Sequence, residues 1–331
     1  MKILFVFTGG TIGSVYSGNV IGLDSKMPYA LIEEYSKKYP IDFDYDVISP
    51  YSSLSENNTG TELSLLISTV FQANDFDGII IAHGTDTLQY TAAALGYFFG
   101  NSCKPICVVS SNYPISDVRA NGIYNLHSAI SLIKLKSEKG VFVAYKNPND
   151  NKTVIHRASR LLSHDAFSDY LRSAGGAYYG FFDESGSFVR NPDFTEKADA
   201  ISAPASKEIS ATAGNILFLS SCVGMTYPSL DGIKYVLIDS YHSGTVDTAS
   251  EQARRFYFSA RERGISVFLA GAYSGAQYQS VKEFEPLSII PIPNIAPIAL
   301  YLKLWLYSQS GAVEKELLLS SRGGDIIDFF S

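Results

Sequence analysis

One stretch decides the fold: Val6-Phe7-Thr8-Gly9-Gly10-Thr11-Ile12-Gly13. Residues 3–7 predict a buried parallel strand, because a short run of aliphatic and aromatic residues ends there at a turn signal. Glycine has no Cβ atom, so backbone N–H groups of the loop can approach a ligand and a threonine hydroxyl can face it. The alternatives are an ordinary glycine turn and a partial dinucleotide-binding fingerprint, although the glycine spacing does not match that fingerprint.

A second apolar run ends in a loop of the same kind, which adds a carboxylate: Ile79-Ile80-Ile81-Ala82-His83-Gly84-Thr85-Asp86-Thr87. The carboxyl ends of parallel strands line one edge of an open α/β sheet, and ligands bind in the crevice where the strand order reverses. We therefore expect the two loops to be neighbours at one edge of the sheet.

Composition limits the class of ligand. The 331 residues are 46% hydrophobic and 18% charged, which is typical of a globular protein with room for two domains. A net charge of −7 argues against nucleic acid as the main partner, because phosphate binding needs a cationic face. We expect a small polar ligand instead. No signal peptide is recognisable and no apolar run is long enough to cross a bilayer, so we expect a cytoplasmic protein without a membrane partner.

The cysteines and histidines do not indicate a metal site. Cys103, Cys107 and Cys222 lack metal-site spacing, and we expect them to be buried small hydrophobic side chains without a disulfide framework. None of the five histidines forms a metal-spaced pair such as His-Glu-x-x-His. We expect no catalytic metal and no cofactor.

Strands and helices alternate in the first half of the chain. Expected strands cover residues 3–7, 43–48, 78–82, 105–109 and 141–145, and expected helices cover residues 29–38, 63–71, 91–99 and 121–135. This alternation predicts an α/β fold with a doubly wound, mainly parallel sheet.

The second half of the chain predicts a smaller α/β domain. We place the larger N-terminal domain at residues 1–187, an aperiodic linker at residues 188–213 and the smaller domain at residues 214–331. Expected strands of the smaller domain cover residues 216–219, 235–238 and 266–270, and an expected helix covers residues 250–263. An apolar helix over residues 295–308 is typical of a core or an oligomer contact.

The two loops together suggest nucleophilic chemistry. Thr11 and Thr85 both follow strands, and Asp86 adds a carboxylate beside the second. A threonine hydroxyl becomes a nucleophile when a base takes its proton and a donor array stabilises the oxyanion, and the loop glycines could supply that array. N-capping of the following helix is the alternative use of Asp86 and Thr87. His83 could act as a base, but a lone histidine beside glycine is more often a hydrogen-bonded structural group.

At this point three motifs carry a resemblance. Thr8-Gly9-Gly10-Thr11-Ile12-Gly13, Ser55-Glu56-Asn57 and His83-Gly84-Thr85-Asp86-Thr87 occur in this order over residues 1–135. Together they resemble the bacterial-type L-asparaginases, nearer to the type I cytosolic branch. The resemblance implies an amidohydrolase without a cofactor, which assembles as a homodimer or a homotetramer.

The resemblance assigns roles to residues of both loops. Thr11 would be the nucleophile that attacks the side-chain amide, and Thr85 would be the second catalytic threonine. Asp86 would act with Thr85 and also bind the α-amino group of the substrate, near Glu56. Ser55 would hold the α-carboxylate. Gly10 and Gly84 would border the substrate, and an anionic pair beside hydroxyls and N–H groups does suit a zwitterionic amino acid.

The chain also departs from the family pattern. The family's catalytic lysine follows a motif that resembles residues 157–162, but Ser163 stands at the next position. Arg160 is a candidate replacement, although an arginine gives electrostatic support only. The family's flexible-loop tyrosine has no match at its expected place, Ile21, and Tyr16 is the nearest candidate.

These observations favour an enzyme that converts L-asparagine to L-aspartate and ammonia through a threonine acyl-enzyme. A divergent amidase would act on glutamine, a D-amino acid amide or a modified residue. A non-catalytic amino acid sensor would bind asparagine or aspartate and would tolerate the loss of the lysine. A nucleotide-binding α/β protein would need a ribose-binding acid at the end of the second strand, where Ile48-Ser49-Pro50 stands.

Overall fold

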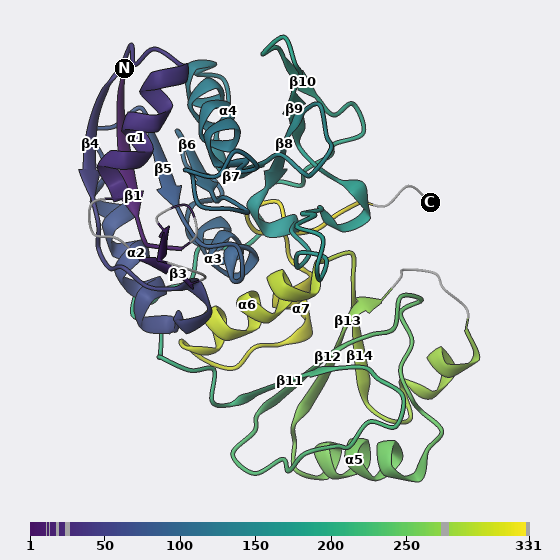
Figure 1. Cartoon of the computed structure of the whole chain (residues 1–331). Helices are drawn as coiled ribbons and strands as arrows, with labels where there is room; N and C mark the ends of the chain where they lie inside the picture. Colours follow the sequence, from purple (N-terminus) through teal and green to yellow (C-terminus); the bar gives the residue numbers. More distant parts are fainter. Residues whose placement is uncertain (11, 13, 18–19, 24–26, 273–277, 329–331) are drawn as a thin grey trace.

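The computed structural model describes residues 1–10, 12, 14–17, 20–23, 27–272 and 278–328. Two sheets of parallel or mainly parallel strands form two domains, and Figure 1 shows the larger, N-terminal one beside the smaller one. The predicted fold class, a larger doubly wound domain with a smaller C-terminal α/β domain, is confirmed.

Five parallel strands form the main part of the larger sheet, in the order β4-β1-β5-β6-β7. They are β1 (Lys2–Phe7), β4 (Asp44–Ile48), β5 (Gly78–Ala82), β6 (Pro105–Val109) and β7 (Gly140–Tyr145). The order turns back at β1, which lies between β4 and β5. The carboxyl edge of β1 and β5 is therefore the switch point at which such sheets bind ligands.

Helices cover both faces of this sheet because side chains of β1 alternate between two cores. Leu4 and Val6 pack with helices α2 (Gly60–Gln72) and α3 (Leu88–Phe99), whereas Ile3 and Phe5 pack on the opposite face. The helices of that second face are α1 (Met27–Lys38) and α4 (Gly122–Lys134). This alternation is the physical basis of the doubly wound arrangement.

Three antiparallel strands extend the sheet beyond β7 and were not predicted. They are β8 (Thr153–Arg157), β9 (Gly180–Phe182) and β10 (Phe188–Arg190). They are short, and β8 is buried throughout, so neither length nor alternation identifies them in the sequence. The predicted linker over residues 188–213 remains a prediction, but its first three residues form β10.

A hairpin of β2 (Ser14–Ser17) and β3 (Val20–Leu23) follows the first loop. Its backbone register places Tyr16 opposite Ile21. Tyr16, the tyrosine named as the nearest candidate, and Ile21, the expected place for it, are thus neighbours on one hairpin.

The smaller domain has a four-stranded parallel sheet in the order β11-β12-β13-β14. Its strands are β11 (Ile216–Ser220), β12 (Tyr235–Asp239), β13 (Ser266–Ala272) and β14 (Ile289–Pro293), and its main helix is α5 (Glu251–Glu262). The prediction omitted β14, whose Pro291 and Pro293 argue against a strand on sequence grounds. It is an edge strand, where proline is tolerated.

The helices after β14 return to the larger domain. They are α6 (Pro297–Ser308) and α7 (Lys315–Leu319), and Figure 1 shows α6 between the two sheets. Tyr301 of α6 stacks on Phe218 of the smaller domain at 5.2 Å and meets Tyr90 of the larger one. Of the two predicted uses of this helix, the structure shows the core.

Two further findings concern the surface. Cys107 is buried as predicted, but Cys103 and Cys222 are exposed, which corrects the expectation for both. The error arises because a lone cysteine in a loop has no neighbours that force it into a core. Within the described part of the chain, no helix is both long and apolar enough to cross a membrane.

Candidate functional site

The loop after β1 is held against two neighbours by its backbone. The Thr8 hydroxyl donates to Ala82 O at 2.9 Å, which ties the end of β1 to the end of β5. Gly9 and Gly10 have φ angles of 101° and 78°, values that strongly favour glycine. Gly9 forms a bridge with Ser53, and Gly10 N donates to Ser53 O at 3.2 Å. The Gly10 N–H is therefore already used within the fold, so the predicted donor array needs other N–H groups.

Three loops meet where the glycines leave room. A Cβ atom on Gly10 would overlap the backbone of Gly84, and a Cβ atom on Gly84 would overlap the side chain of Ser55. The loops after β1 and β5 are therefore in direct contact, as predicted, with Ser55 of the short helix η2 (Ser55–Asn57) beside them. Close backbone approach is the physical reason for glycine at both positions.

The predicted alternative use of the second loop, helix capping, is not what Thr87 does. Thr87 occupies the N-cap position of α3 but its side chain makes no capping hydrogen bond. Its hydroxyl donates instead to Ser55 O at 2.9 Å. Thr87 thus fixes the distance between the second loop and η2.

His83 has the structural role that the sequence left open. Its Nδ1 lies 2.8 Å from Gly84 O, which can only accept, so Nδ1 carries the proton. Nε2 then accepts from the Thr91 hydroxyl at 2.9 Å and from the Asn58 amide at 3.3 Å. Burial lowers the pKa of His83 to about 4. The imidazole is neutral and fully engaged inside the protein.

A cavity of about 650 Å³ opens beside these loops. One wall consists of residues from η2, the β5–α3 loop and the start of α3: Glu56, Thr85, Asp86, Thr87, Gln89 and Tyr90. The second wall consists of residues from one loop: Ser163, His164, Asp165, Ala166, Phe167 and Asp169. Of the predicted site residues, the cavity brings together Glu56, Thr85 and Asp86. Ser55 is 3% exposed and lies behind this lining.

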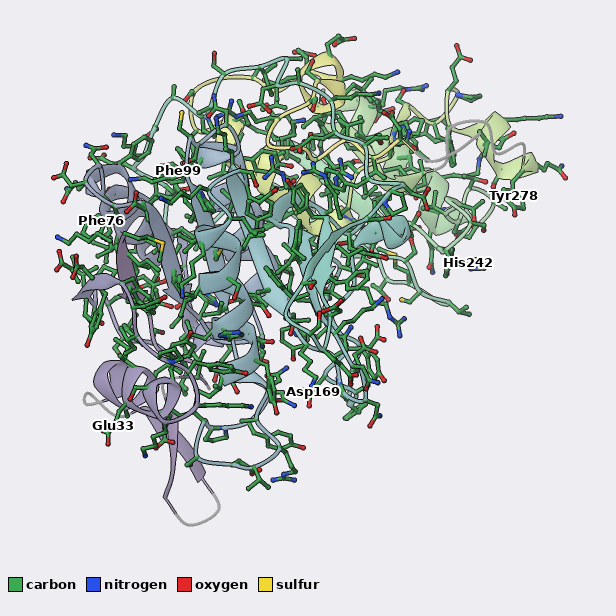
Figure 2. The ribbon with its side chains drawn as sticks, turned by 90° about the horizontal axis from the view of Figure 1, so that it is seen from above. Glu33, Phe76, Phe99, Asp169, His242 and Tyr278 are labelled. Carbon is green, nitrogen blue, oxygen red and sulfur yellow. The ribbon has the colours of Figure 1, made fainter. Side chains whose placement is uncertain are left out.

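The second wall belongs to a hairpin over residues 161–173. A bridge between Leu161 and Ser173 closes its base, and Leu162 N donates to Arg172 O at 2.9 Å. The Tyr170 hydroxyl donates to Pro148 O at 2.9 Å, which anchors the hairpin to the turn after β7. Figure 2 shows Asp169 of this hairpin on the larger domain, with His242 and Tyr278 on the smaller one.

No lysine or arginine is among the described residues that line the cavity. Arg160, the predicted replacement for the lysine, is fully buried elsewhere. Its guanidinium donates to Gly324 O and to Thr195 O, both at 2.7 Å, and lies over the ring of Phe194. Arg160 therefore ties the C-terminal segment to the larger domain and does not line the cavity.

His164 is the residue of this site that sequence reasoning missed. Both ring nitrogens are out of contact with solvent, and neither has a hydrogen-bond partner among the described residues. The ring meets Tyr145 edge-on at 5.2 Å. Burial lowers the pKa of His164, and the carboxylates of Asp169, Asp86 and Asp165 raise it. The only signal in the sequence was its place directly after Ser163.

Two of the predicted site residues are not fully described by the structure. Thr11 lies outside the described residues, and for Tyr16 only the backbone is placed, on β2. Within the described ranges, no cluster of three or more histidine, cysteine or acidic side chains is arranged to hold a metal ion.

Fold and site together define an α/β protein with a polar cavity at the carboxyl edge of a doubly wound sheet. The model of the asparaginase family's N-terminal region matches residues 2–170. The chain belongs to the asparaginase family, which confirms the predicted resemblance.

Two relatives differ in how much of the chain they match. L-asparaginase 1 of Escherichia coli K12 is 31% identical over 132 residues, which are 39% of each chain. This chain therefore spans well under half the length of that relative. A glutamyl-tRNA(Gln) amidotransferase subunit from Thermofilum pendens is 25% identical over 93% of this chain and 71% of its own.

A solved structure confirms the fold over the whole length. The thermostable L-asparaginase from Thermococcus kodakarensis superposes with a TM-score of 0.81, covering 99% of this chain and 100% of that one. The two sequences are 18% identical, so the likeness concerns the fold.

Proposed function

We propose that this protein is an amidohydrolase that converts L-asparagine to L-aspartate and ammonia. The observation that supports the proposal is the cavity lined by Glu56, Thr85 and Asp86, beside the contact of Gly10 with Gly84. Two carboxylates on one wall can recognise an ammonium group, and hydroxyls next to them can serve acyl transfer. The proposal includes a cytoplasmic location and a homo-oligomeric assembly.

The proposed reaction has two steps. Thr11 Oγ forms a bond to the side-chain amide carbon of the substrate, the hydroxyl proton passes to the amide nitrogen, and the carbon–nitrogen bond breaks to release ammonia. Water then hydrolyses the ester, which restores the threonine and gives the β-carboxyl group of aspartate. In this proposal, Asp86 and Glu56 bind the α-amino group, Ser55 binds the α-carboxylate, and Thr85 is the second hydroxyl of the site.

A different amide is the second candidate substrate. The relative named as part of an amidotransferase matches 93% of this chain, whereas the named L-asparaginase of Escherichia coli matches 39%. Because of this difference in coverage, several amides should be compared as substrates. A non-catalytic amino acid sensor is the further alternative, because the cavity has no lysine among its described lining residues.

The test is ammonia release by the purified protein with L-asparagine, L-glutamine and D-asparagine in parallel. The Thr11→Val variant is the blank. Turnover of L-asparagine that the variant lacks supports the proposal, and a faster rate with another amide favours the second candidate. If all three are inert while aspartate raises the melting temperature, the protein is a sensor.

A further inference from the structure

A second cavity of the larger domain, of about 330 Å³, shares no lining residue with the candidate site. It lies between the end of α1, helix α4 and the β9–β10 turn, and Figure 1 shows α4 between the other two. Its lining includes Tyr39, Tyr124, His127, Lys146 and Lys152, and we call this cavity the lysine groove. A neighbouring cavity of about 530 Å³ shares Tyr124 and Lys146 with it. The two hollows therefore meet at this pair of side chains.

Two lysines converge on one ring at this meeting point. Lys38 Nζ, from the end of α1, lies 3.7 Å from the centroid of the Tyr124 ring, and Lys146 Nζ lies 4.3 Å from it. The two ammonium groups are therefore no more than about 8 Å apart, a distance at which like charges repel. A third lysine of the groove, Lys152, has its Nζ 4.5 Å from the centroid of the Phe181 ring.

These three lysines have no ion pair among the described residues. Lysines close by do have carboxylate partners: Lys134, also on α4, pairs with Asp42 at 2.6 Å, and Lys37 pairs with Glu34 at 2.6 Å. The chain has 33 acidic and 26 basic residues, so carboxylates are not scarce. A group of unpaired cations in an acidic protein indicates a place for an anion that comes from outside the chain.

The carboxylates that line the groove belong to the β9–β10 turn. Asp183 accepts from the backbone N–H groups of Ser185 and Ser187, both at 2.9 Å, so its charge is used to hold the turn. Glu184 is exposed at the same turn. Neither carboxylate forms an ion pair with a described lysine of the groove.

His127 adds a polar group to the floor of the groove. Its ring stacks on Tyr39 at 3.7 Å, and its Nδ1 lies 3.2 Å from the Tyr35 hydroxyl. Burial and the charges of Lys134 and Lys38 lower its pKa, so the imidazole is neutral at pH 7. When the tyrosine donates to Nδ1, Nε2 carries the proton and is a donor for an anion.

We propose that the lysine groove binds a phosphate group, held by Lys38, Lys146 and Lys152. Lysine binds phosphate as a point charge, and the oxygens of a tetrahedral dianion can accept from ammonium groups that approach from different elements. The three lysines come from the end of α1, the end of β7 and the start of β8. The inference does not depend on the proposed amidohydrolase function, because it concerns a separate cavity.

The test is equilibrium dialysis at constant ionic strength, with inorganic phosphate and glycerol phosphate as separate probes. We expect saturable binding of one phosphate group per subunit. Lys146→Gln should weaken this binding by about tenfold or more, because a charged donor is lost. Lys207→Gln is the matched control, since Lys207 Nζ also lies over a ring, that of Phe71 at 3.6 Å, but outside the groove. Its affinity for phosphate should be unchanged.

A second pair of variants tests the convergence at Tyr124. Lys38→Gln should weaken phosphate binding, whereas Lys37→Gln, one position away and paired with Glu34, should not. Circular dichroism checks that each variant is folded. In the unmodified protein, phosphate should also shift the imidazole NMR signals of His127 and leave those of the exposed His242 in place.

The outcomes separate the sources of the phosphate group. Tighter binding of glycerol phosphate than of inorganic phosphate supports a phosphorylated small molecule, and the reverse supports free phosphate. Equal affinities of Lys146→Gln and Lys207→Gln overturn the inference, and so does the absence of saturable binding of both probes. Citrate that binds more tightly than either probe overturns the assignment to phosphate. Ammonia release from asparagine is measured separately, so failure of the proposed function leaves this test intact.

Discussion

The two walls of the cavity are built by different means. Next to the first wall in the sequence, Gly10 and Gly84 let two strand-end loops touch, and both ring nitrogens of His83 are hydrogen-bonded. On the second wall, a hairpin places His164 beside the cavity with no described partner for either nitrogen. The first wall follows the family motifs and the second departs from them. The comparison teaches that local glycine motifs set the loops beside the first wall, whereas the second wall depends on the tertiary contacts of a hairpin.

Arg160 and His164 sharpen this comparison, because both are buried polar groups within four positions of each other. Arg160 holds the C-terminal segment through carbonyl groups, and its charge serves the fold. His164 makes no hydrogen bond to the described residues through its ring nitrogens. A cation close in sequence to the expected lysine is therefore a poor guide to the residue that faces the cavity.

The largest expected effect concerns the proposed nucleophile, Thr11. Thr11→Val should lower turnover by at least ~10³-fold, because the proposed nucleophile is lost while an isosteric side chain keeps the fold. Thr61→Val, on the exposed start of α2, is the matched control and should keep the full rate. The measurement is steady-state ammonia release, with circular dichroism as the check of folding. An undiminished rate in Thr11→Val removes this residue from the mechanism.

Next in size is the effect of filling the space between the two loops. Gly10→Ala puts a side chain at a φ of 78° and against the Gly84 backbone, so we expect a loss of about 3 kcal/mol of stability and of most activity. Gly311→Ala meets nothing within 4 Å and is the control. Chemical denaturation measures the free energy of unfolding of both variants. Equal stability of the two variants would mean that the loops are not in contact.

The third prediction concerns Arg160, which is buried near the second wall in the sequence but does not line the cavity. Arg160→Ala should cost about 3 kcal/mol of stability, because several buried carbonyl groups lose their donor. The rate of ammonia release per folded molecule of Arg160→Ala should stay within a few-fold of that of the unmodified protein, since Arg160 does not line the cavity. A large drop in that rate with intact stability would restore Arg160 as the substitute for the lysine.

The smallest effect concerns pH and the histidines that are fully buried. Burial lowers the pKa of His83 to about 4 and that of His156 to about 3. Because the unfolded chain ionises near the ordinary value, it binds more protons than the native state as the pH falls, so stability is complete at neutral pH and is lost in acid. Between about pH 7.5 and 5 we expect a loss of about 2 kcal/mol for each histidine.

Urea unfolding at several pH values measures this loss. His156→Gln should remove roughly half of the pH dependence. A free energy of unfolding that is independent of pH over this range would mean that both histidines titrate normally in the native protein.

The sequence predicted the larger sheet and the contact of its two loops because local patterns determine both. Apolar runs of five residues define β1 and β5, and glycine marks the close approach at Gly10 and Gly84. The second wall depends on tertiary contacts instead. The hairpin that holds His164 has no periodic pattern, and its position follows from hydrogen bonds to the turn after β7. The strands β8, β9 and β10 were missed for the same reason.

The most direct test of the central claim is to trap the proposed ester on Thr11. The protein would be mixed with L-asparagine, quenched in acid and mapped by peptide mass spectrometry. We predict an aspartyl adduct on Thr11 that is absent from Thr11→Val. Ammonia release with no adduct on the peptide that contains Thr11, or with an adduct on another residue, would contradict the account.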